Sequence, residues 1–215
     1  VYNWTNNTTS IGLAASGTGN IISFTATNST TAPVTATITV TPTYTNGAVS
    51  CVGTPSTFTI TVNPTATVTT VPNQVVCNGA ATTAINFSSP TTGGTIVYNW
   101  TNNTTSIGLA ASGTGNISSF TATNSTTAPV TATITVTPTY TNGAVSCVGT
   151  PSTFTITVNP TATVTSVANQ VVCNGTSTTA VNFNSPTTGG TIVYNWTNNT
   201  TSIGLAASGT GNISS

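Results

Sequence analysis

Short runs of alternating apolar and polar residues recur along the chain, separated by Gly, Pro and Asn. The run 129–140 has apolar residues at every second position, with threonines between them: Val130, Ala132, Ile134 and Val136. The run 154–158 alternates in the same way and has Phe154, Ile156 and Val158 on its apolar side. A period of two is typical of an antiparallel strand with one buried face, so each run predicts such a strand.

Four further segments predict strands, and residues 141–143 predict a turn. In 96–100 the residues on one face are Ile96, Tyr98 and Trp100; the other segments are 83–87, 119–124 and an opening strand at 65–71. No segment has the period of a helix. About seven short strands between Gly, Pro and Asn turns predict an all-β fold of the β-sandwich type.

The same twenty residues, VYNWTNNTTSIGLAASGTGN, begin at Val1, Val97 and Val193. Residues 1–96 and 97–192 differ at seven positions only, and residues 193–215 repeat 97–119 without a change. A repeat of 96 residues is too long for a solenoid unit, which needs its neighbours to form a core. It suits a self-contained domain of about 100 residues, the size of an immunoglobulin-like sandwich.

Asn-Pro steps at 63–64 and 159–160 predict the boundaries between these domains. Proline holds the preceding residue extended and cannot donate to a sheet, so each step predicts a short, stiff junction. Residues 64–159 are then one complete repeat. Residues 1–63 are the C-terminal part of one β-sandwich repeat, and residues 160–215 are the N-terminal part of the next.

The chain of 215 residues contains no Lys, Arg, Asp, Glu or His. It therefore has no basic patch for nucleic acid, no acidic face for cations and no general base to activate its many hydroxyl groups. We expect no enzyme activity and no catalytic, cofactor or metal site in this stretch. No run of about 20 apolar residues predicts a membrane-inserted helix.

Several strings of the sequence together resemble one known family. They are NQVVCNG, YNWTNNTTSIGLAASGTGNISSFTATN, APVTATITVTP and FTITVNPTATV. Over its whole length the chain resembles the PKD-like/immunoglobulin-like tandem repeats of giant cell-surface proteins in Bacteroidota. This resemblance implies an extracellular array of β-sandwich domains, of the kind found in adhesins and gliding filaments exported by type IX secretion.

Four cysteines, two in each full repeat, are candidates for disulfides: Cys51, Cys77, Cys147 and Cys173. An even number in an extracellular array favours disulfide bonds over metal binding. We expect a pair within one domain, Cys77–Cys147, with Cys51 and Cys173 bonded to domains beyond the chain. The alternative is a pair of bonds between neighbours, Cys51–Cys77 and Cys147–Cys173.

The aromatic residues Trp100 and Tyr98, with their copies Trp4 and Trp196, fall on a predicted strand. We expect this tryptophan to be the central core residue of the sandwich. The alternative is an exposed platform on which a sugar ring stacks.

The repeat and its junctions predict a structural role. We expect a stalk or filament segment on the cell surface that holds an adhesive element away from the cell, with neighbouring repeats of the same chain as partners. The first alternative is self-association, in which identical uncharged chains pack laterally into a multi-chain fibre or sheath. The second is a glycan-binding module.

Overall fold

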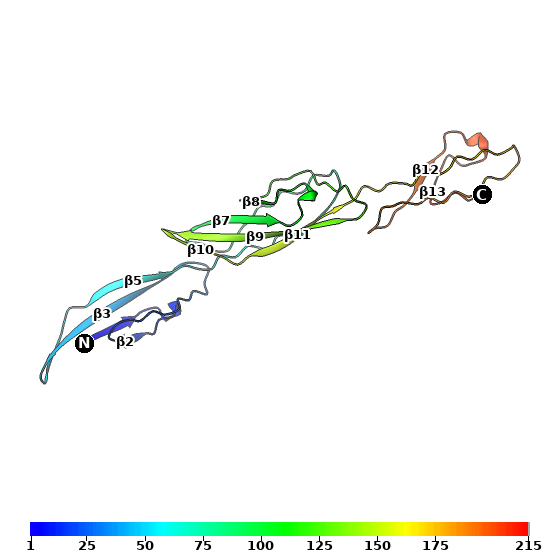
Figure 1. Cartoon of the computed structure of the whole chain (residues 1–215). Coiled ribbons are helices and arrows are strands. Elements are labelled where there is room, and N and C mark those ends of the chain that lie inside the picture. The colour runs from blue at the N-terminus through cyan, green and yellow to red at the C-terminus, as the bar shows by residue number, and fades with distance from the viewer. Residues whose placement is uncertain (215) are drawn as a thin grey trace.

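The computed structural model describes residues 1–214 and is almost entirely β, with 39% of residues in strands and 4% in helical turns. Three sheets follow one another along an elongated molecule whose two ends carry the termini (Figure 1). Within these described residues, no sheet crosses an Asn-Pro step. We name residues 1–63, 64–159 and 160–214 the first, middle and third units. The predicted all-β class is confirmed.

The middle unit is built on one six-stranded sheet. Its order is β6-β11-β9-β7-β8, and β10 pairs with β9 beyond the end of β7. The strands are β6 (Gln74–Cys77), β7 (Thr95–Asn102), β8 (Ser112–Thr114), β9 (Val130–Asn142), β10 (Val145–Val148) and β11 (Ser152–Asn159). All pairs are antiparallel except β6 with β11.

The long alternating runs form the strands that their pattern predicts. On β9 the side chains of Ala132, Ile134 and Val136 are fully buried, and on β11 Phe154, Ile156 and Val158 are almost or fully buried. The threonines between them lie on the other face. The register pairs Ile134 with Phe154, which places the two apolar rows side by side over one core.

A second layer covers this apolar face, but it is made of extended chain and not of regular strands. Residues 80–87 and 117–122 meet through two isolated bridges, Ala81 with Thr121 and Ile85 with Ile117. Phe87 from this layer packs on Phe154 of the sheet with ring centroids 6.3 Å apart. The strands predicted at 83–87, 119–124 and 65–71 are therefore wrong as regular strands. The two segments bridge only at these two pairs, so no continuous ladder forms between them.

The first and third units repeat parts of this pattern. The first has β1 (Tyr2–Asn6), β2 (Ser16–Thr18), β3 (Val34–Asn46), β4 (Val49–Val52) and β5 (Ser56–Val62), and the third has β12 (Asn195–Thr197) and β13 (Ser208–Thr210). A single turn of 3-10 helix recurs as η1 (Thr9–Ile11), η2 (Thr105–Ile107) and η3 (Thr201–Ile203).

Buried Asn102, at the end of β7, organises the loop that follows in the repeated twenty-residue segment. Its amide nitrogen donates to the carbonyl of Leu109 at 3.0 Å, and its amide oxygen accepts from the backbone N–H of Thr104 at 3.0 Å. The copies Asn6 and Asn198 hold the same partners in the other units. The hydrogen bonds of this side chain satisfy loop backbone groups that have no neighbouring strand to pair with.

We expect Asn102→Ala to destabilise the middle unit by about 1–3 kcal/mol, because it leaves buried backbone groups without partners. Amide hydrogen exchange of β7 and β9, followed by NMR, measures the change. Asn99→Ala on the same strand is the matched control, since exposed Asn99 accepts only one surface hydrogen bond, from Thr114. Equal effects of the two substitutions would contradict this role for Asn102.

Candidate functional site: the junctions between units

The residues that contact a neighbouring unit come from the turn before β7 and from the β9–β10 hairpin. The turn has the sequence TTGG (91–94), and Gly93 adopts φ +81°, a conformation that favours glycine. The backbone N–H of Thr92 donates to the carbonyl of Thr31 in the first unit at 2.8 Å. This hydrogen bond joins two units across the Asn63-Pro64 step.

Gly93 also lies directly against Pro33 of the first unit. A β-carbon at Gly93 would lie only 2.6 Å from Cδ of Pro33. The proline ring has little freedom to move, so only glycine can approach it this closely at position 93. Pro33 in turn presents a rigid surface to the turn. The two units are therefore joined by close packing as well as by the covalent chain.

Tyr140 near the end of β9 supports this turn from inside the middle unit. Its side chain is fully buried, its hydroxyl donates to the carbonyl of Thr92 at 3.2 Å, and its ring lies against Gly94. Tyr140 therefore fixes the turn that contacts Thr31 and Pro33.

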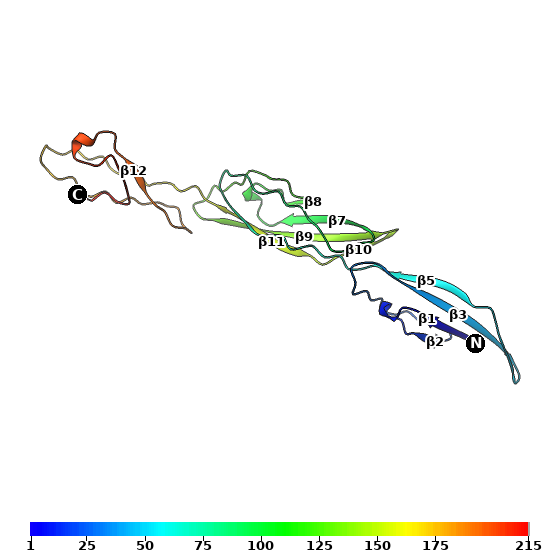
Figure 2. The same ribbon diagram turned by 180° about the vertical axis from the view of Figure 1, so that it is seen from behind.

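The β9–β10 hairpin supplies a further contact at the same junction. The amide of Asn142 donates to the amide oxygen of Asn63, the last residue of the first unit, at 2.9 Å. Pro64 beside it is fully buried. Seen from behind, the hairpin of the middle unit points toward the first unit, and the β3–β4 hairpin points away from the middle unit (Figure 2).

The junction between the middle and third units repeats the two turn contacts 96 residues later. The N–H of Thr188 donates to the carbonyl of Thr127 at 2.8 Å, and a β-carbon at Gly189 would lie 2.5 Å from Cδ of Pro129. The amide of Asn78 adds a hydrogen bond to the Thr161 hydroxyl at 3.0 Å. The two junctions therefore share the Thr–Thr hydrogen bond and the Gly–Pro contact, which are made from neutral groups only.

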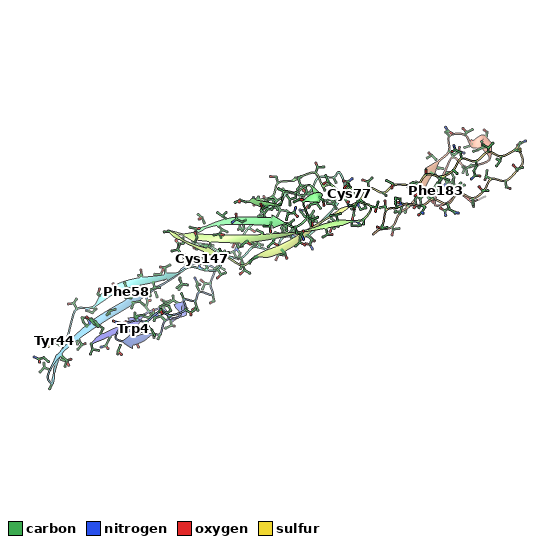
Figure 3. The ribbon with its side chains drawn as sticks, viewed as in Figure 1. Trp4, Tyr44, Phe58, Cys77, Cys147 and Phe183 are labelled. Atoms are coloured by element: carbon green, nitrogen blue, oxygen red, sulfur yellow. The ribbon has the colours of Figure 1, made fainter. Side chains whose placement is uncertain are left out.

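The cysteine predictions fail on geometry. Cys77 ends β6 opposite Asn159, and Cys147 lies on β10 opposite Tyr140, so the two thiols lie at opposite ends of the middle unit (Figure 3). About ten residues of β9 separate them, or roughly 33 Å at the rise of a strand. A disulfide needs Cα atoms within about 7 Å. The predicted Cys77–Cys147 bond is therefore wrong.

The alternative bonds between neighbours are absent as well, and all four cysteines are free. Cys51 lies opposite Tyr44 at the outer end of the first unit, far from Cys77 (Figure 3). Exposed Cys173 makes no bond with Cys147. The prediction missed this because the sequence places cysteines in a domain without showing which end of the domain they occupy.

The aromatic residues lie in and beside the cores. Trp4 and Trp100 are 8% and 7% exposed, Trp196 is half-buried, and Tyr98 packs against the core beside Phe87 at a centroid distance of 5.6 Å. Burial raises the pKa of the Tyr98 phenol above its ordinary value. The rings of Trp4 and Trp100 thus form no surface platform for a sugar.

The search of protein-family models, of curated proteins and of solved structures found no match for this chain. The family resemblance therefore stays a prediction. Within residues 1–214, no helix is long and apolar enough to cross a membrane.

The Asn-Pro steps predict boundaries between the repeats, but the sequence does not show which residues make contacts across them. Thr31, Pro33 and Thr92–Gly94 belong to loops well inside each unit. Their signal is the identical recurrence of TTAPV and TTGG at the 96-residue period. Recurrence alone could not distinguish these loops from the rest of a repeat that is identical almost everywhere.

Proposed function

We propose that this chain is a stalk or filament segment of a large extracellular surface protein, in which the repeated domains hold an adhesive element away from the cell. The observation that carries the proposal is the recurrence of one junction geometry at both boundaries, through Thr92–Thr31 and Thr188–Thr127. An array built with one constant junction extends in one direction with every added unit. Length is then the property that the repeat supplies.

The neutral composition supports this role. With no ionisable acid or base among the side chains except Cys and Tyr, the junction hydrogen bonds keep their strength over wide ranges of pH and salt. The chain also offers no Lys or Arg to trypsin-like proteases. Both properties suit a segment exposed outside the cell.

The family and the fold type belong to the same proposal. We infer immunoglobulin-like or PKD-like sandwiches of the Bacteroidota surface-repeat kind. The two-layer middle unit, with its buried Trp100 and its size of 96 residues, supports that assignment.

A second candidate function is lateral packing of identical chains into a sheath. The observation that favours it is the outer face of the sheet, where threonines of β9 and β11 lie side by side without any charge. Thr131 and Thr157 form one of these pairs, with hydroxyls 2.8 Å apart, and Thr35 and Thr61 repeat it in the first unit. Such a face carries no charge that would repel a second copy of the chain.

Sedimentation velocity over a hundredfold range of concentration separates the two functions. The stalk requires a single elongated species of one chain, with a sedimentation coefficient that does not rise with concentration. A sheath requires larger species at the higher concentrations. Substituting Thr131 and Thr133 by lysine is the control, since it would abolish lateral association and leave the monomer unchanged.

A further inference from the structure

The middle unit carries its two cysteines at opposite ends, and each end meets a different neighbour. Cys77 lies beside Asn78, whose amide donates to Thr161 of the next unit at 3.0 Å. Cys147 lies on the hairpin whose Asn142 donates to Asn63 of the preceding unit at 2.9 Å. Both thiols are therefore junction residues, although they belong to different junctions.

The 96-residue period shows which positions come together at one junction. Asn63 is the copy of Asn159, and Asn159 is the strand partner of Cys77. The hairpin of one unit thus contacts Asn63 of the preceding unit. The copy of Cys77 in that preceding unit lies beside Asn63. Paired residues of a sheet point their side chains to the same face.

Within the hairpin, Cys147 lies on the same face as Asn142. Asn142 pairs with Val145, and Tyr140 pairs with Cys147. Cys147 is two residues from Val145 on the same strand, so Cys147 and Asn142 share a face. Across the junction, Asn63 and the copy of Cys77 are also partners on one face. The Asn142–Asn63 hydrogen bond therefore brings the two cysteine positions to the same side of one junction.

We propose that Cys77 of each unit forms a disulfide with the Cys147 copy of the following unit. Two thiols would lose two protons and two electrons to an extracytoplasmic thiol–disulfide oxidoreductase or to a disulfide such as oxidised glutathione, and one S–S bond would form. The partners of all four cysteines then fall outside residues 1–215. The pairing is therefore consistent with four free thiols in this chain.

The consequence is mechanical. In a fully bonded array, a pulling force would pass from a bond at Cys147 to the next bond at Cys173, through only 26 residues. Fully extended, 26 residues span about 90 Å. Two units, each with a strand of 13 residues such as β9, are about 85 Å long when folded. The bonded array could hardly lengthen even if its domains unfolded.

The test lengthens the chain by its own repeat. Adding residues 120–159 after Ser215 completes the third unit, because residues 193–215 repeat 97–119. Replacing Cys51 and Cys147 by serine leaves three thiols: Cys77, Cys173 and the added copy of Cys147. The peptides around Cys77 and Cys173 differ in sequence, NQVVCNGA against NQVVCNGT, so mass spectrometry distinguishes them.

After refolding in a glutathione buffer, we expect one disulfide, between Cys77 and the added cysteine, and one reactive thiol instead of three. In the control Cys77→Ser, both remaining thiols should stay reactive. A bond between Cys173 and the added cysteine, or three free thiols, would overturn the proposal. This inference and the proposed function can fail separately. A monomeric stalk without the disulfide would contradict this inference alone, and a sheath that contains the disulfide would contradict the stalk alone.

Discussion

Replacing Trp100 with alanine should destabilise the middle unit by about 3–5 kcal/mol. The indole is 7% exposed and packs between β8 and the core, and a β-carbon on Gly113 would lie 2.2 Å from its ring. Removing the ring leaves a cavity that the rigid sheet around it cannot close. The slowest-exchanging amides of β9 and β11, followed by NMR, report the free energy of unfolding.

Two control variants make this result specific. Trp100→Phe keeps an aromatic ring and removes an indole N–H that has no hydrogen-bond partner among the described residues, so its cost should be clearly smaller. Trp196→Ala alters the third unit and should leave exchange in the middle unit unchanged. A loss below about 1 kcal/mol for Trp100→Ala would contradict the placement of this ring in the core.

The second large effect is expected at the junction. Gly93→Ala should open the contact between the first and middle units, because its β-carbon meets Cδ of Pro33 at 2.6 Å. The hydrogen bond from Thr92 to Thr31 is then lost, and we expect the Thr92 amide to exchange at least tenfold faster. Exchange of the core amides of β9 should change much less.

Gly79→Ala is the matched control for this substitution. Gly79 has almost the same backbone conformation, φ +83° against +81°, but nothing lies within 4 Å of the added carbon. Both variants carry the strain of a non-glycine residue at positive φ, roughly 1–2 kcal/mol. If Gly79→Ala speeds exchange at Thr92 as much as Gly93→Ala does, the Pro33 contact does not hold the junction.

The parts of the fold that the sequence could predict are those where side chains alternate without interruption. On β9 and β11, Ile134, Val136 and Phe154 are buried where the period of two places them. The second layer was harder, because its segments hold each other through single bridges such as Ile85 with Ile117. A single bridging pair leaves no alternating pattern in the sequence, so the sequence could not show that these segments are not regular strands.

The junction and the cysteines needed three-dimensional information for a different reason. Gly93 and Pro33 are 60 positions apart, and neither belongs to a strand. Cys77 and Cys147 share one unit in the sequence but lie at its opposite ends, because β6 and β10 pair with opposite ends of the sheet. Only the register of β9 with its partners shows which end each residue occupies.

The central claim is that one constant junction makes the array a rod. Small-angle X-ray scattering from chains lengthened by whole 96-residue repeats tests it most directly. We predict that the maximum dimension rises by the same increment for every added repeat. Freely jointed domains would instead give a dimension that grows roughly as the square root of the number of repeats, and that result would contradict the account.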